Sequence, residues 1–259
     1  MLVFELEYPG TWLDFAPEEK GREIRNLLSN IESHFTEASL ALNWFLSSIS
    51  RPRPFPSQAD WENESNRKRE ITESLVGPMT GMRDFTQYDE ARHQADILFK
   101  REQWSKGTLP RNFQHSEAFV FAKAFLYSID GIDRTLDVIA AIAGVPDMVK
   151  KCQVRFDAAF PHLRDVRNTA HHLEDRTRSL DKRRKPIQLQ SITNSFINAP
   201  GGGVLVLNAL NGTKFGSTMA DGHYGEVDVH PSSMQAIQGV VQELLKAFSW
   251  HGPKSHYPS

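Results

Sequence analysis

One stretch of the chain, residues 163–176 (LRDVRNTAHHLEDR), concentrates the side chains that could carry out acid–base and phosphate chemistry. It contains Arg164, Arg167, Asn168, His171 and His172. Histidine titrates near neutral pH and is the most common general acid or base in enzymes. The planar guanidinium of arginine pairs well with a phosphate. These residue types make Arg164, Arg167, Asn168, His171 and His172 the candidates for a site with acid–base chemistry.

The spacing of this stretch predicts an amphipathic helix. At about 100° per residue, the apolar positions 163, 166, 170 and 173 share one face, and the polar candidates fall on the opposite half. Asn168 and His172 are four residues apart, so they could interact directly on a helix. A solvated face without function is the alternative, but paired histidines beside arginines are an unusual way to make a helix soluble, since Lys and Glu form helices more readily.

Residues 167–172 (RNTAHH) resemble the Arg-x4–6-His motif of the HEPN superfamily, a group of helical-bundle proteins that includes many metal-independent ribonucleases. The resemblance is best with Arg167 as the arginine, Asn168 as the polar residue after it, and His172 as the histidine. Arg164 with His171 fits the same loose spacing, so both assignments stay open. The apolar segment 117–130 is similar to the helix that packs beside the motif helix in that family.

The resemblance implies an endoribonuclease that needs no metal. In such proteins two motif helices meet in a homodimer and form one composite site. A histidine would act on the ribose 2′-hydroxyl or the leaving 5′-oxygen, and an arginine would bind the scissile phosphate. Asn168 would orient His172. The implied partners are RNA, a second copy of the chain, and an antitoxin or defence-system protein, in a role as toxin or defence effector.

A basic run directly follows the candidate stretch. Six basic side chains and one acidic side chain lie between positions 176 and 185, which gives a net charge of +5. Such a run could follow an RNA backbone, although a solvated linker would have the same composition. The predicted nucleic-acid-binding residues are Arg176, Arg178, Lys182, Arg183, Arg184 and Lys185.

The composition of the whole chain limits the classes of function. The 259 residues carry 30 basic and 32 acidic side chains, a net charge of −2, so any contact with a polyanion must be a local patch. The single Cys152 excludes a disulfide framework and a cysteine zinc cluster, and we expect it to be a packing residue. Because neighbouring residues of a helix point about 100° apart, His171 and His172 are poor joint metal ligands. We expect no metal and no cofactor.

The order of patterns along the chain predicts a mainly α protein. Helical spacing begins near position 17 and ends at the prolines of 52–56, and further helices are expected over 58–75, 88–104, 116–143, 146–160 and 161–178. Residues 204–219 then alternate around Asn211-Gly212, a strong signal for a β-hairpin, and a second turn at Asp221-Gly222 leads to a third strand over 224–229. One more strand is possible within 188–197.

We therefore predict a HEPN-like helical bundle over residues 1–178, a basic and glycine-rich connector over 179–203, and a small antiparallel β-meander with a closing amphipathic helix over 204–250. The closing helix begins at Pro231 or Ser232. We expect it to pack on the apolar face of the meander, and this unit to dock on the bundle.

The localisation expected from the sequence is cytoplasmic. The apolar start of the chain lacks a positive region and is followed by Glu5 and Glu7, so no secretory signal is expected. The most apolar segment, 118–145, is interrupted by three aspartates, which argues against a membrane span. Two alternatives to the ribonuclease stay open: a non-catalytic HEPN-like module that binds RNA, a nucleotide or a protein, and a plain helical interaction protein.

Overall fold

A computed structural model describes residues 1–52, 56–77 and 85–258. The fold is mainly α, with small antiparallel β-sheets in its C-terminal part and a closing helix, as predicted. The chain forms two compact units. The first contains residues 1–49 and 117–259, and the second contains residues 50–116.

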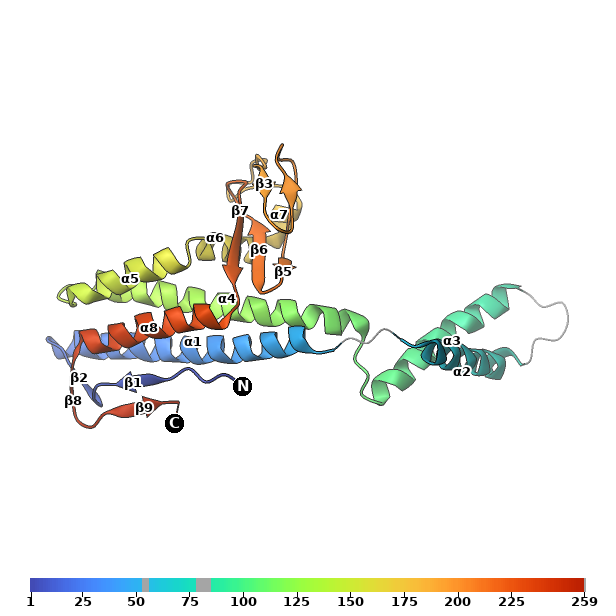
Figure 1. Cartoon of the computed structure of the whole chain (residues 1–259), viewed down its shortest axis with the longest axis horizontal. Helices are drawn as coiled ribbons and strands as arrows, with labels where there is room; N and C mark the ends of the chain where they lie inside the picture. Colours follow the sequence, from blue (N-terminus) through green and yellow to red (C-terminus); the bar gives the residue numbers. More distant parts are fainter. Residues whose placement is uncertain (53–55, 78–84, 259) are drawn as a thin grey trace. The chain divides into compact units, whose positions relative to one another are not determined.

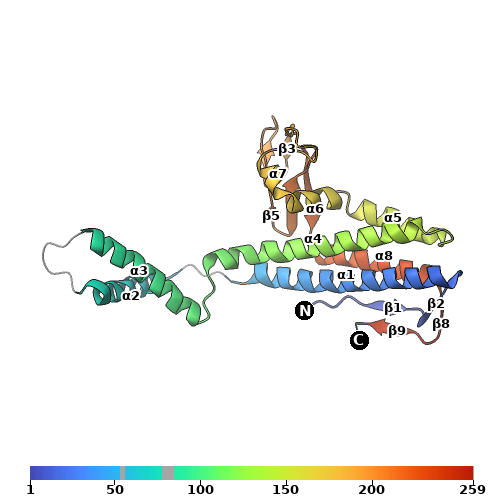
Figure 2. The same ribbon diagram turned by 180° about the vertical axis from the view of Figure 1, so that it is seen from behind.

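Four long helices form the body of the first unit. They are α1 (Glu18–Ser50), α4 (Arg111–Ala141), α5 (Asp147–Ala159) and α8 (Pro231–Ala247). Helices α1, α4 and α8 run side by side, and α5 packs on α8 (Figures 1 and 2). The expected helices over 146–160 and from 231 are confirmed, whereas α4 begins at 111 rather than 116.

The core of this unit is built from the apolar stripes of these helices. Residues of α1 and α4 at steps of three and four are buried, among them Phe35, Leu42, Phe125 and Ile132. This periodicity is the reason that the chain folds as helices here, because burial of one stripe supplies most of the stability of an amphipathic helix.

The second unit is a helical hairpin of α2 (Gln58–Val76) and α3 (Phe85–Ser105). Ser57 caps α2 in a capping box with Asp60. Ion pairs join the two helices, including Arg67 to Glu102 at 2.7 Å and Lys68 to Asp96 at 2.7 Å. The sequence pattern placed this hairpin within one bundle over 1–178. The structure separates it, because its helices bury few apolar residues and pair mainly with each other.

The predicted helix over 161–178 is broken in two. Helix α6 (Leu163–His171) is followed by His172, whose backbone is not helical, and then by the short α7 (Leu173–Thr177). His172 is the C-cap of α6: its N–H still donates to the carbonyl of Asn168 at 2.9 Å, four residues earlier, and the helix ends there.

The β-meander consists of β5 (Ala209–Asn211), β6 (Lys214–Thr218) and β7 (Tyr224–Asp228), paired in that order. Asn211 pairs with Lys214, so the two-residue turn is Gly212 and Thr213, one position later than Asn-Gly suggested. Gly212 has a positive φ of 61°, which a hairpin turn needs. Strand β5 is shorter than predicted, because Asn208 adopts a φ of 48° and ends the extended run.

The apolar face of the meander packs on α6 instead of on the closing helix. Helix α6 contacts both β6 and β7, and Thr169 Oγ1 donates to the carbonyl of Thr218 at 3.2 Å. Helix α8 packs on α5 and on β1. The prediction that the closing helix covers the sheet was therefore wrong, because its apolar stripe completes the core of the helical body.

Three further pairs of short strands complete the β structure, and two of them join distant parts of the chain. Strand β1 (Leu6–Tyr8) pairs with β9 (Ser255–Tyr257), and β2 (Trp12–Asp14) pairs with β8 (Ser249–His251), so the two ends of the chain lie together (Figure 1). Strand β3 (Ile192–Thr193) pairs with β4 (Asn198–Ala199) in the predicted connector. These strands have two or three residues, too few for a recognisable alternation.

Helix α5 offers a matched pair of positions that tests the core. Phe156 is 1% exposed and its ring centroid lies 5.0 Å from that of Phe160, whereas Val154 is 66% exposed on the same helix. Phe156→Ala should lower the free energy of unfolding by about 3–5 kcal/mol, because it leaves a cavity. Val154→Ala should change it by about 0.5 kcal/mol or less. Urea denaturation followed by circular dichroism measures both, and equal losses would contradict the packing of α5.

Candidate functional site

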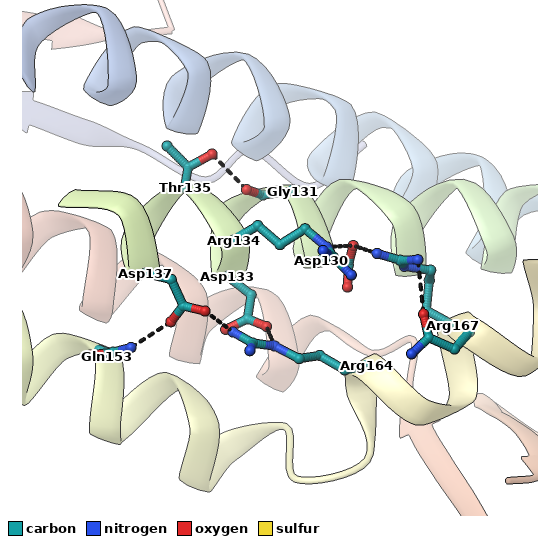
Figure 3. Close-up of polar contacts among 10 residues, drawn as sticks. Asp130, Gly131, Asp133, Arg134, Thr135, Asp137, Gln153, Arg164 and Arg167 are labelled. Carbon is teal, nitrogen blue, oxygen red and sulfur yellow. Dashed lines mark hydrogen bonds and ion pairs between the residues drawn. The ribbon is translucent and has the colours of Figure 1, made fainter. Parts of the chain in front are cut away.

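Three aspartates form a row on α4 that faces the candidate helix α6. Asp130, Asp133 and Asp137 are three and four residues apart, so they share one face of α4. Asp130 and Asp133 are buried. Figure 3 shows this row opposite Arg164 and Arg167, the two arginines of the candidate motif.

Arg167 is enclosed by its partners. Its Nη2 donates to Asp130 at 2.5 Å and its Nη1 donates to Asn168 Oδ1 at 3.0 Å. The Arg167 side chain is 15% exposed, and its Nε is buried without a hydrogen-bond partner among the described residues. The same Asp130 carboxylate accepts a bond from Arg134 Nε at 2.7 Å within α4. The sequence predicts that the Arg167 guanidinium binds a scissile phosphate, but in the structure it is already paired with the Asp130 carboxylate.

Arg164 is bound in a similar way but is more open to solvent. Its Nε donates to Asp133 and its Nη2 donates to Asp137 at 2.5 Å, while 45% of its side chain is exposed. The hydrogen bond to Asp133 is the main reason that the pKa of Arg164 is raised. Burial and then the charge of Asp133 raise the pKa of Asp157 on α5.

The charges on this surface nearly cancel. Arg134, Arg164 and Arg167 face the three carboxylates of the aspartate row, and Gln153 of α5 also donates to Asp137. A neutral patch has little attraction for a polyanion. The sequence predicted arginines presented to a phosphate, and the structure corrects this: both serve as ties between α6 and α4.

Asn168 does not orient His172 with its side chain. Its Oδ1 accepts the bond from Arg167, and only its backbone carbonyl contacts His172, whose N–H donates to it at 2.9 Å. The amide therefore positions Arg167, and the predicted role of Asn168 as a guide for the histidine is wrong.

The two histidines are exposed candidates that no carboxylate of the aspartate row engages. His171 and His172 are exposed at the junction of α6 and α7, and their rings meet edge to face with centroids 4.9 Å apart. Tyr127 of α4 packs edge-on against His171 at 6.4 Å. His172 Nδ1 lies 3.7 Å from Glu174 Oε1. Two acid–base groups therefore sit side by side on the surface, with an acceptor near one of them.

The basic run forms a loop that we call the basic loop, residues 178–185. Arg178, Lys182, Arg183, Arg184 and Lys185 are exposed there. Asp181 Oδ1 accepts from the backbone N–H groups of Lys185 at 2.8 Å and of Arg183 at 2.7 Å, which lowers the pKa of Asp181. The acidic residue thus holds the loop in shape, and the loop presents five basic side chains.

Arg176 does not belong to this surface. It is 2% exposed, and its Nη1 donates to the carbonyl of Leu180. Its predicted role in binding nucleic acid is wrong, because the turn after α7 folds over the side chain. The charged part of its side chain organises the basic loop from beneath.

Comparisons of the chain with family models, curated proteins and solved structures gave no match. The site must be interpreted from its own geometry.

Other chemistry has little support in the described part of the chain. Its histidines, cysteine and carboxylates form no cluster that could hold a metal ion. Cys152 is fully buried, and burial raises the pKa of its thiol to about 11, which fits a packing residue and disfavours a nucleophile. Among the described helices, none is long and apolar enough to cross a membrane.

The aspartate row is the feature that sequence reasoning missed. Asp130, Asp133 and Asp137 were noted only because they interrupt an apolar helix. Their spacing carried a further signal: aspartates on one face of a strongly apolar helix are rarely buried without cationic partners. Two arginines three residues apart on a neighbouring helix, Arg164 and Arg167, are such partners.

The aspartate row can be tested by comparing a buried member, Asp130, with its most exposed member, Asp137. The side chain of Asp130 is 6% exposed and that of Asp137 is 33% exposed. Asp130→Ala leaves Arg167 enclosed without its carboxylate and should lower the free energy of unfolding by about 3–5 kcal/mol. Asp137→Ala should lower it by about 1 kcal/mol. Urea denaturation measures both, and a loss at Asp130 no larger than that at Asp137 would refute the tie.

Proposed function

We propose that this protein binds single-stranded RNA through one surface, formed by the basic loop and by His171 and His172. The observation that supports it best is the exposure of five basic side chains on an ordered loop that follows α7 directly. With Asp181 as the only acidic residue in the loop, its net charge is +4. Phosphate contacts of this kind supply most of the affinity in non-specific RNA binding.

The binding function is favoured over the full ribonuclease mechanism because of the state of the two arginines. A composite HEPN-type site needs an arginine free to hold the scissile phosphate. Arg167 is paired with Asp130 and mostly buried, and the opposite face of α6 lies on the β-meander. The HEPN resemblance of residues 167–172 therefore agrees better with a non-catalytic RNA-binding module.

The salt dependence of RNA binding tests the basic loop. The double variant Arg183→Ala/Arg184→Ala should lower the slope of log Kd against log salt by about 1.4, because each phosphate contact on single-stranded RNA contributes about 0.7. Fluorescence anisotropy with a labelled 20-nucleotide RNA measures this slope. The control Lys150→Ala/Lys151→Ala removes the same charge from exposed positions of α5 and should leave the slope unchanged. Equal effects of the two double variants would contradict the proposal.

We infer cleavage of the bound RNA as a second candidate function, because two imidazoles are exposed side by side. One histidine would take the proton of a ribose 2′-hydroxyl, whose oxygen attacks the adjacent phosphorus. The other would give a proton to the 5′-oxygen that leaves, so the products are a 2′,3′-cyclic phosphate and a 5′-hydroxyl. DNA lacks the 2′-hydroxyl and would not react.

The homodimer and the role as toxin or defence effector belong to the same proposal and rest on the HEPN resemblance. In a homodimer, the exposed junction of α6 and α7 is the part of the motif that a second subunit could approach, since the other faces of α6 lie on α4 and on the sheet. A cytoplasmic toxin or defence effector, held in check by an antitoxin or other defence-system partner, would fit this arrangement.

A metal-free cleavage assay separates the two candidate functions. If the chain cleaves, purified protein should cut single-stranded RNA in the presence of EDTA, and His172→Ala should lower the rate by about 100-fold or more, the usual contribution of a general acid or base. His93→Ala changes an exposed histidine of α3, outside the motif and the pocket described below, and should not alter the rate. RNA binding without metal-free cleavage, or cleavage that His172→Ala leaves intact, would rule out the catalytic proposal and leave binding standing.

A further inference from the structure

A polar pocket of about 500 Å³ lies apart from the motif residues, between the β-meander and the corner that joins α5 to α6. Its floor includes Phe160 and His162, and one wall is the segment 191–194, which contains β3. The opposite wall is the outer strand β7 with Lys214 of β6. This volume is within the range of pockets that hold small organic ligands.

Three charged side chains from the same face of the sheet line this pocket. Lys214 lies directly opposite Asp228 in the β6–β7 register, and its Nζ is 3.5 Å from Glu226 Oε2. Asp228 Oδ1 accepts from Thr213 at 2.6 Å. Glu226 Oε1 is buried and has no hydrogen-bond partner among the described residues. The pocket therefore offers one cationic donor beside two carboxylates whose capacity to accept hydrogen bonds is only partly used.

Gly216 keeps this corner of the pocket open to Tyr224. A Cβ atom at Gly216 would lie 2.2 Å from the Tyr224 hydroxyl, so no other residue type fits beneath the ring. Burial and the nearby charge of Glu226 raise the pKa of Tyr224 to about 12, so the hydroxyl keeps its proton at neutral pH. That hydroxyl also lacks a hydrogen-bond partner of normal geometry in the described structure. The sheet thus places a neutral donor next to Glu226, in addition to the cationic donor Lys214.

The chain leads from the basic loop into one wall of the pocket. Leu180 pairs with Pro186 at the base of the loop, and the chain then runs along the turn of the meander, where Gln190 N–H donates to the carbonyl of Gly222 at 3.1 Å. The next residues form the pocket wall. At its other end, α6 carries the paired histidines, about 13 Å from His162 for a helix of nine residues. An RNA strand on the basic loop could place one base in the pocket.

We infer that this pocket binds a guanine base. The Watson–Crick edge of guanine presents an acceptor, O6, followed by two donors, N1–H and the 2-amino group, which complements one lysine beside two carboxylates. Adenine presents one donor, its 6-amino group, followed by the acceptor N1, and uracil presents one donor, N3–H, between two carbonyls, so each would set a lone pair against a carboxylate. The inference rests on the proposed function for RNA as the source of the base, and a free guanine nucleotide is the other source of the same chemistry.

Nucleotide binding tests the pocket without RNA. The protein should bind guanosine 5′-monophosphate at least tenfold more tightly than adenosine 5′-monophosphate in isothermal titration calorimetry, since the two probes share the phosphate and ribose. Glu226→Gln keeps the shape of the side chain and should remove this preference. Tyr224→Phe should weaken the binding of guanosine monophosphate severalfold. The control Glu243→Gln makes the same change at an exposed site on α8 and should have no effect.

The outcomes separate the pocket from the proposed RNA function. Equal affinity for the two nucleotides, or a preference that survives Glu226→Gln, would overturn the inference. The double variant Arg183→Ala/Arg184→Ala should bind RNA more weakly but should still prefer guanosine monophosphate to adenosine monophosphate. A 12-nucleotide oligouridine with one central guanosine should bind at least threefold more tightly than oligouridine alone if the base comes from RNA. If the protein prefers guanosine monophosphate but binds both oligonucleotides equally, the pocket binds guanine and its ligand is a free nucleotide.

Discussion

The ion pairs between α4 and α6 hold in place the short helix on which the β-meander packs. Helix α6 has nine residues, too few to be stable alone, and Asp130 and Asp133 hold it through Arg167 and Arg164. Its opposite face then receives the β-meander, with Val166 fully buried. A rotation of α6 by one residue, about 100°, would remove the arginines from their partners and expose the apolar face that carries the sheet.

This arrangement divides the charged residues of the motif between structure and surface. An arginine that is mostly buried against a buried carboxylate is held there, since separating them would leave an uncompensated charge in a poorly hydrated place. Arg167 is in this position, and Arg176 is enclosed by the turn after α7. In the function that we propose, contact with a polyanion therefore falls to the basic loop, and acid–base chemistry to His171 and His172.

The β-meander connects these surfaces to a further cavity. By covering α6, it brings the turn at Gly222 against the chain that leaves the basic loop, and the outer strand β7 against the α5–α6 corner. The basic loop, the histidine pair and the guanine pocket are thus carried by segments that pack around one short helix. A protein that binds RNA, reads one base and acts near it could use all three together, and this is the unifying interpretation of the C-terminal part.

The sequence by itself determined the helices and the meander, because helical spacing, proline, and turn residues such as Gly212 act within a few neighbouring positions. It also located the candidate stretch and the basic run. It did not determine the break at His172 or which arginines face solvent. A free arginine and a paired one have the same letter and the same formal charge, and the aspartate that binds Arg167 lies 37 residues earlier in the chain. Only the packing of α4, α6 and the sheet decided which charges were enclosed, because pairing and burial depend on residues that are distant in sequence and adjacent in space.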